Sequence, residues 1–354
     1  MCDFVKSNSQ TDMDISALVH LPVRISPEFC QRNADGVRYG MGLAACADLG
    51  LLVISSGDRL QVFSLPDDIV ARCHVQSELA HVGTLGGVAP IEFQFCYSSG
   101  YMAFTDGCGG VSTANTANRR LLLVTDYGKS NGSGAVHVID VVRGTHVGYV
   151  AAPGTIMYPS GVATRKSLAA VSCWDSDHAF QAVRVFEGSG ASWTAVRVIV
   201  GGNSWPSGLR FTADCSRLVV ANGRGVSIVC AKDGSFLRHI DAEVYPKDVE
   251  ECDFGWIMCL FGGLAAVSDD AGPRRREFNT GYHCSAVAVV PGLGLLVVRH
   301  DTGVHFLATP DAVAMAAMSS CKVAWMVAVC RAAILRARDG RTTAITRKRK
   351  HRFS

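Results

Sequence analysis

Three observations predict an all-β fold in which similar sheets repeat around a ring. A pattern of glycine, an apolar run, a Gly/Asp/Asn turn and a second apolar run recurs at intervals of about 40 to 50 residues. Its clearest copies are Gly42–Phe63 and Gly208–Val229. Apolar and polar residues alternate within the runs, which is typical of strands. Glycine is abundant, with 36 copies in 354 residues, as many tight turns require.

The spacing of the repeats predicts how the sheets are arranged. Units begin at residues 42, 91, 161, 208, 248 and 286, and three of them keep twenty residues between the opening and the third strand. A small four-stranded sheet cannot bury both faces alone, and closing six of them into a ring leaves few edges. The sequence therefore predicts a six-bladed β-propeller over residues 41–311. A pair of β-sandwiches is the alternative, but sandwiches would not need a Pro-Ser-Gly opening repeated at unit starts.

Residues 1–40 form a predicted N-terminal arm. Within it, Ala17–Ile25 alternates well enough for one strand, and Pro22 favours an edge position. We hypothesise that this strand completes the last blade and so joins the two ends of the ring.

The strands of the six units follow in order, each bounded by glycine-, proline- or aspartate-rich turns. The second unit carries a Gly/Ser/Thr/Ala/Asn-rich insertion at Gly107–Asn118, and the fifth is the most degenerate. The expected runs are Leu51–Ile54 and Leu60–Phe63; Ile91–Phe95, Leu121–Val124 and Ala135–Ile139; Pro159–Val162 and Val183–Phe186; Pro206–Leu209, Leu218–Val220 and Val226–Val229; Pro246–Val249 and Trp256–Leu260; and Ala286–Val289, Leu295–Val298 and Val304–Leu307.

The openings Pro159-Ser160-Gly161-Val162 and Pro206-Ser207-Gly208-Leu209, with the strand ends Val183–Phe186 and Leu60–Phe63, resemble NHL-type β-propeller repeats. The resemblance covers roughly residues 40–310. Units two and five depart from it through the insertion and through lost turn residues. It implies a six-bladed ring that binds partners on one face, and it transfers no catalytic residue.

The C-terminal segment, residues 312–354, differs from the ring. Ala312–Leu335 is rich in helix-forming residues, and a basic tail follows. Ten Lys/Arg and one acid lie between Lys322 and the end, so the rest of the chain is mildly acidic. The tail resembles a nuclear-localisation or nucleic-acid-binding patch, and a solvated end is the alternative. Its basic residues are Arg347, Lys348, Arg349, Lys350 and Arg352. Lys322 disfavours a membrane anchor.

The fourteen cysteines include no C-x-x-C pair, and several lie inside apolar runs, where cysteine acts as a small hydrophobe. Residues 1–16 lack the apolar core of a signal peptide. We therefore expect a reduced, intracellular protein, cytoplasmic or nuclear, without disulfides.

Polar residues follow the second strand of several units, and such turns fall on one face of a propeller. They provide a candidate docking surface, although Asp and Asn also serve simply to stabilise turns. The candidates are Asp126, Asp175, His178, Asn222, Arg224, His300 and Asp301. Trp174 and Trp205 lie at or near turns and are either interface anchors or fillers between blades.

No metal centre or catalytic set can be assembled from the sequence, and no cofactor is expected. His137 and His305 occupy the same place in their third strands, which indicates a polar face and not a ligand set. A lactonase-like calcium site needs several carboxylates on first strands, where Glu92 stands alone, with Glu250 and Glu251 close by.

The sequence thus favours a non-enzymatic scaffold that binds a protein partner on one propeller face. The alternative is a propeller hydrolase or lyase with a divalent metal in its channel. A third hypothesis is nucleic-acid binding through the basic tail.

Overall fold

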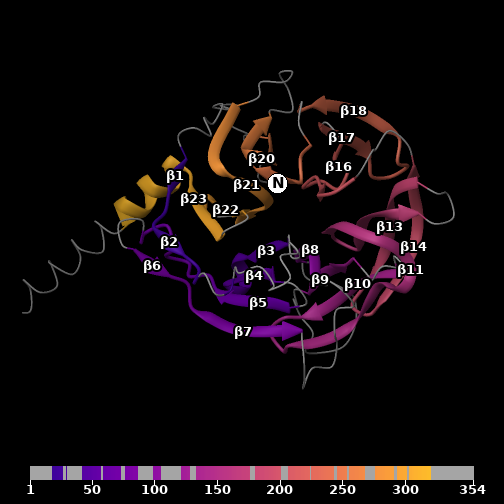
Figure 1. Cartoon of the computed structure of the whole chain (residues 1–354), viewed down its shortest axis with the longest axis horizontal. Helices are drawn as coiled ribbons and strands as arrows, with labels where there is room; N and C mark the ends of the chain where they lie inside the picture. Colours follow the sequence, from indigo (N-terminus) through magenta and orange to yellow (C-terminus); the bar gives the residue numbers. More distant parts are fainter. Residues whose placement is uncertain are drawn as a thin grey trace, which may run out of the picture.

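The strands surround a central axis in the computed structural model (Figure 1). The structure describes residues 18–26, 29, 42–56, 59–72, 76–86, 99–104, 121–127, 133–175, 180–200, 206–223, 225–242, 245–252, 255–267, 276–290, 293–300 and 303–319. The innermost strands follow one another around the axis. Each lies beside the next in the order β3, β8, β11, β15, β19 and β21, and β21 lies beside β3, which closes the ring.

The first sheet is antiparallel, with strand order β3-β4-β5-β7. Its second and third strands form the hairpin that the sequence predicts, with Ser56 opposite Arg59. The bounds are β3 (Leu43–Cys46), the 3₁₀ turn η3 (Ala47–Leu49), β4 (Leu51–Ser56), β5 (Arg59–Ser64) and β7 (His81–Gly86).

The second sheet has seven strands, in consecutive order from β8 to β14. Its bounds are β8 (Ser99–Phe104), β9 (Leu122–Asp126), β10 (Ser133–Asp140), β11 (Thr145–Arg165), β12 (Leu168–Asp175), β13 (Phe180–Ser189) and β14 (Ser192–Val200).

Two further sheets complete the ring: β15 to β18 form four antiparallel strands, and the last sheet has the order β1-β23-β22-β21-β20-β19. The bounds are β15 (Leu209–Phe211), β16 (Arg217–Asn222), β17 (Gly225–Cys230), β18 (Phe236–Asp241), β19 (Asp248–Cys252), β20 (Gly255–Val267), β21 (Arg276–Val290), β22 (Leu295–His300), β23 (Gly303–Ala308) and β1 (Val19–His20). A parallel pair, β2 (Val23–Arg24) with β6 (Ser77–Glu78), lies outside these sheets.

The prediction of six separate blades is wrong: the described residues form five hydrogen-bonded sheets. The sequence suggests a break before Pro159, but β11 runs through it. The strand pairs with β10 up to Met157, and it pairs with β12 at Met157 and again from Gly161 onward. The irregularity between these two positions includes Tyr158, whose φ is +45°. Predicted units two and three therefore share one sheet. In the same way, β21 pairs first with β20 and then with β22, which joins units five and six.

The N-terminal arm adds to the last sheet. Val19 and His20 of β1 pair antiparallel with β23, and the Leu21 amide donates to the Phe306 carbonyl. The single strand expected over residues 17–25 is instead two short ones, because Pro22 has no N–H with which to continue a ladder. The arm is thus the strand that joins the two ends of the described ring.

A helix over residues 310–319 follows β23 and packs Ala312 against the ring. Its first turn is capped by Thr309, whose Oγ1 accepts from the Ala312 amide at 3.2 Å. The remainder of the predicted helical segment and the basic tail lie outside the described residues. Within the described part of the chain, no helix combines the length and apolar character needed to cross a membrane.

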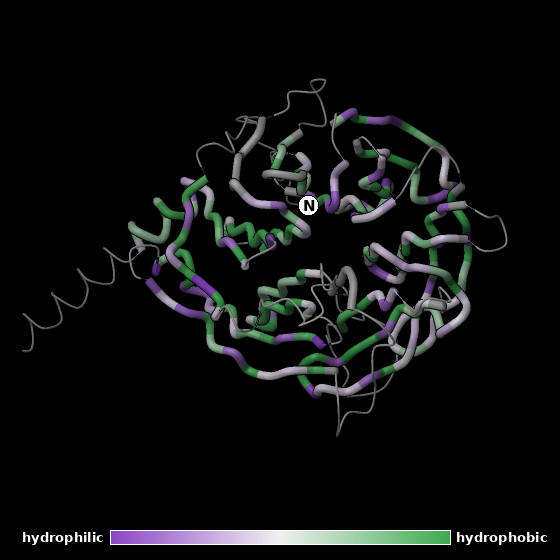
Figure 2. The backbone as a smooth tube through the Cα atoms, in the orientation of Figure 1, coloured by the Kyte–Doolittle hydropathy of each residue, from purple (hydrophilic) through white to green (hydrophobic). Residues whose placement is uncertain are grey.

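The core lies between neighbouring sheets. Val183 and Val185 of β13 cluster with Leu209 and Phe211 of β15. Phe63 of the first sheet and Phe306 of the last, both fully buried, share another cluster with Leu21. Hydrophilic residues appear along the outermost strand β18 (Figure 2). Cys173 and Cys259 are buried in these apolar clusters, as the sequence predicts for small hydrophobes.

Leu21 tests the contribution of the arm to the ring. We expect Leu21→Ala to lower the free energy of unfolding by about 2–5 kcal/mol, because a fully buried leucine would be truncated where the ends of the chain meet. Urea unfolding followed by circular dichroism measures this. Leu237→Ala is the matched control, since Leu237 is 52% exposed. Equal midpoints for the two variants would contradict the proposed role of the arm.

Candidate functional site

Three short segments on the inner strands hold neighbouring sheets together: one lies within β11, one precedes β15 and one leads into β19. We call Pro159–Gly161, Pro206–Gly208 and Pro246–Asp248 the opening segments. The Ser160 hydroxyl donates to the Pro206 carbonyl at 3.0 Å, and the Ser207 hydroxyl donates to the Pro246 carbonyl at 3.1 Å. Each serine therefore binds the proline of the next opening segment. Hydrogen bonds of this kind stabilise a fold by roughly 0.5–1.5 kcal/mol each.

The glycines of the opening segments permit this close approach. A Cβ on Gly161 would lie 1.8 Å from the Ser207 carbonyl oxygen, and one on Gly208 would lie 2.2 Å from Asp248 Oδ1. Only glycine leaves room for the neighbouring backbone here. The Pro-Ser-Gly pattern is thus a device for packing one inner strand against the next.

Residues of all three opening segments also line a cleft with a volume of about 350 Å³. Its walls are aromatic: Tyr127 follows β9, Trp174 lies near the end of β12, and the rings of Tyr127 and Tyr158 are 5.0 Å apart. Aromatic walls with a few polar groups are typical of binding sites. The described lining residues are Tyr127, Tyr158, Ser160, Cys173, Trp174, Gln181, Pro206, Ser207, Tyr245 and Lys247.

Lys247 provides the cleft with a positive charge. Its ammonium lies 4.4 Å from the centre of the Tyr245 ring, a cation–π contact. Burial lowers the pKa of Lys247 and raises the pKa of Tyr245, because both charged forms lose water. No acidic residue is among the described lining residues, so the cleft favours a neutral or anionic group.

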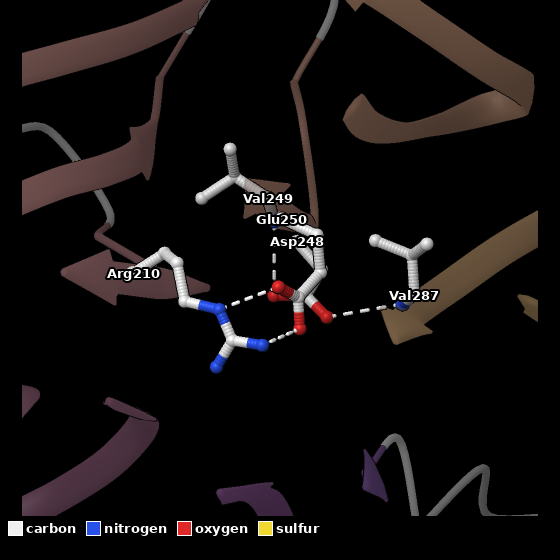
Figure 3. A network of polar contacts seen from close by, with 5 residues as sticks. All are labelled: Arg210, Asp248, Val249, Glu250 and Val287. Atoms are coloured by element: carbon white, nitrogen blue, oxygen red, sulfur yellow. Dashed lines mark hydrogen bonds and ion pairs between the residues drawn. The ribbon is translucent and has the colours of Figure 1, made fainter. Parts of the chain in front are cut away.

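A second polar cluster lies beside the opening segments, between β15 and β19 (Figure 3). Arg210 forms a two-pronged ion pair with Glu250, donating from Nε and Nη2 to the two carboxylate oxygens. Asp248 accepts from the Val249 amide at 3.0 Å and from the Val287 amide of β21 at 3.1 Å. Burial and the Glu250 charge raise the pKa of Asp248 to about 8. This cluster connects three successive inner strands.

The cluster does not suit a divalent cation. A calcium site needs several carboxylate oxygens directed at one point, and both Glu250 oxygens are directed at a guanidinium. A cation placed there would meet the positive charge of Arg210. No group of three or more His, Cys, Asp or Glu side chains is arranged to hold a metal in the described part of the chain. Glu92 lies outside the described residues.

Three of the predicted docking residues, Asp126, Asn222 and His300, are described with their side chains, and all three are buried. Each contacts the third strand of its own unit. Asp126 Oδ2 lies 3.6 Å from His137 Nε2, Asn222 Nδ2 donates to Ser227 Oγ at 2.8 Å, and His300 stacks on His305 at 4.2 Å. These residues therefore form polar contacts within sheets and not an exposed surface.

The structure does not bring the other predicted candidates into a described site. Asp175 ends β12, but its side chain is not among those described. His178, Arg224 and Asp301 lie outside the described residues, as do Trp205 and the basic tail.

Sequence reasoning missed the tyrosines and Lys247. A signal was present, because an aromatic residue precedes the proline of every opening segment: Tyr158-Pro159, Trp205-Pro206 and Tyr245-Pro246. Tyr127 and Trp174, neighbours of Asp126 and Asp175, line the cleft.

The Arg210–Glu250 pair predicts a non-additive mutational effect. Arg210→Met should lower the free energy of unfolding by about 3–5 kcal/mol, because it leaves a carboxylate buried without its partner. Adding Glu250→Leu should restore most of the loss, since no unpaired charge remains. Urea unfolding of the two single variants and the double variant gives the coupling energy. Additive effects would show that the pair is not coupled.

Asp248 predicts a pH dependence of stability. Its pKa is 3.8 in a model peptide and about 8 in the fold, so the folded state favours the protonated form. This contribution is complete below about pH 4 and is lost as the pH rises toward 8. Asp248→Asn should therefore gain stability relative to the native chain between pH 5 and pH 8, measured by thermal unfolding. Asp233→Asn is the control, because its hydrogen bonds to Ser235 lower the pKa of Asp233 to about 2, outside this window. Parallel curves for Asp248→Asn and the native chain would refute the assignment.

Comparison with known proteins identifies the fold. No protein-family model matches the sequence, and no curated protein does. Among solved structures, the WD40 β-propeller domain of Doa1 is similar, with a TM-score of 0.51, 12% identity, and coverage of 77% of this chain and 79% of that one.

Two gluconolactonase structures are also similar. A gluconolactonase from Xanthomonas campestris has a TM-score of 0.54 and 14% identity over 77% of this chain and 86% of that one. A putative gluconolactonase has a TM-score of 0.56 and 13% identity over 84% of this chain and 94% of that one. At such identities the similarity establishes the architecture alone, and the chain is a β-propeller.

Proposed function

We propose that this chain is a non-enzymatic, intracellular interaction platform of the NHL-like kind, which docks a protein partner in the aromatic cleft. The observation that carries the proposal is the cleft itself, whose lining combines aromatic side chains with residues of all three opening segments. Aromatic residues are enriched at interface cores, and a rigid base limits the entropy lost on binding.

The place of the cleft in the fold supports this function. Two lining residues, Ser160 and Ser207, are each hydrogen-bonded to the next opening segment, so this part of the lining is fixed before a partner arrives. The walls of the cleft include Tyr127, which is 41% exposed and therefore accessible to a partner. Rigid strands with binding residues at their ends are the usual arrangement in such domains.

The alternative is a metal-dependent propeller hydrolase or lyase, since one of the similar structures is a gluconolactonase and another is named a putative gluconolactonase. The Arg210–Glu250 pair argues against it, because the inner-strand carboxylate is neutralised by a guanidinium and not directed at an open coordination site. Metal analysis of the purified chain discriminates between the two functions. One tightly held calcium or zinc per chain would favour the hydrolase.

Variants of the cleft test the docking proposal. Trp174→Ala and Tyr127→Ala should each weaken capture of a partner by about tenfold or more, as expected for aromatic anchors of an interface. The measurement is affinity capture on immobilised full-length protein, followed by direct titration of the retained protein against each variant.

Phe236→Ala is the control for this experiment, because Phe236 is 60% exposed on β18 and does not line the cleft. Tyr127→Ala guards against misfolding, since it removes a partly exposed ring. A partner that binds both cleft variants as tightly as the native chain would refute the proposed docking site.

A further inference from the structure

The charge of the cleft restricts the ligands that it can bind more than its shape does, and so indicates a class of ligand. This inference rests on the proposed function. The described lining carries one positively charged side chain, Lys247, and no carboxylate. Lys247 lies in the third opening segment, where the two preceding segments have serine. Its position is fixed by the backbone, because its amide donates to the Cys259 carbonyl at 2.8 Å and its carbonyl accepts from the Gly208 amide at 3.0 Å.

The aromatic side chains of the cleft favour a ligand with a particular backbone conformation. Tyr127 and Tyr158 lie 5.0 Å apart with their rings tilted by 45°, and Trp174 belongs to the same lining. Grooves lined by tyrosine and tryptophan bind proline-rich segments, whose polyproline II conformation is already formed and loses little entropy.

The positive charge in the cleft then determines which side chain of the bound segment is favoured. A carboxylate that reaches Lys247 gains a charge-assisted hydrogen bond in a partly buried place, whereas a lysine or arginine would be repelled. Burial of Lys247 strengthens this preference, because water screens the charge less there. We infer that the cleft binds a short proline-containing segment of the partner protein that carries a glutamate or aspartate, with the prolines against the aromatic walls and the carboxylate on Lys247.

Three matched peptides test the inference. They are acetylated and amidated Gly-Pro-Pro-Glu-Pro-Pro-Gly and its counterparts with Gln or Lys in place of Glu, titrated calorimetrically into the full-length chain at low salt. The Glu peptide should bind about tenfold more tightly than the Gln peptide, and the Lys peptide should bind most weakly. Added salt should reduce the difference between Glu and Gln.

Lys247→Met keeps the length of the side chain and removes the charge. It should leave binding of the Gln peptide unchanged and reduce the preference for Glu to within about twofold. Lys232→Met is the control, because Lys232 is an exposed lysine outside the cleft, and it should retain the full preference. Equal binding of the Glu and Gln peptides to the native chain, or an undiminished preference in Lys247→Met, would overturn the inference.

Two further outcomes separate this inference from the proposed function. If capture of the partner depends on Trp174 but is unaffected by Lys247→Met, the docking site stands and the acidic ligand class is refuted. If N-acetylglutamate alone binds as tightly as the Glu peptide, the ligand is a small anion, and a protein segment is refuted as its source. Tight binding of the Glu peptide that is lost in both Trp174→Ala and Lys247→Met supports both proposals.

Discussion

The ring depends on the hydrogen bond from the serine of one opening segment to the proline carbonyl of the next. Ser160 binds Pro206 and Ser207 binds Pro246, so the starts of β15 and β19 are each positioned by the preceding inner strand. Apolar packing between sheets provides most of the stability, but it has no direction and tolerates sliding. The serine hydroxyls supply direction, and the glycines beside them supply the space in which two backbones meet.

Elsewhere in the ring, charged side chains form the hydrogen bonds that connect neighbouring inner strands. The third opening segment has Lys247 and Asp248 in place of serine and glycine, and Asp248 reaches the Val287 amide of the following inner strand. At the closure, Arg299 of β22 donates to the Gly42 and Ser55 carbonyls of the first sheet. A segment that lacks the Pro-Ser-Gly pattern can therefore still form a hydrogen bond to the next inner strand. At the third segment, the substitution also places a positive charge beside the aromatic cleft.

Periodicity made most of the ring predictable. The second and third strands of the first, fourth and sixth units lie where the twenty-residue spacing indicates, since a hairpin is fixed by its own turn and alternation. Blade separation was not predictable in this way. At Pro159 the strand continues, and Tyr158 beside it adopts a φ of +45°. The alternation of apolar and polar residues does not reveal this backbone conformation. At the candidate site, the strand pattern identifies the turns that follow second strands, but it does not reveal that Asp126 is buried and that Tyr127 is 41% exposed.

Buried Asp126, Asn222 and His300 explain why polar residues recur after second strands without forming a docking surface. Asp126 and Asn222 each have a polar contact on the neighbouring third strand, and the His300 ring stacks on His305 of its third strand, so the repeat records a requirement of the sheet itself. Polar groups at a buried strand end need such partners, because an unmet donor or acceptor costs roughly 1–3 kcal/mol. A residue type repeated in several units therefore reports on the fold, whereas function is to be sought where the units differ. Lys247 is such a difference: it departs from the serine of its two predecessors and lies in the cleft that the other opening segments help to form.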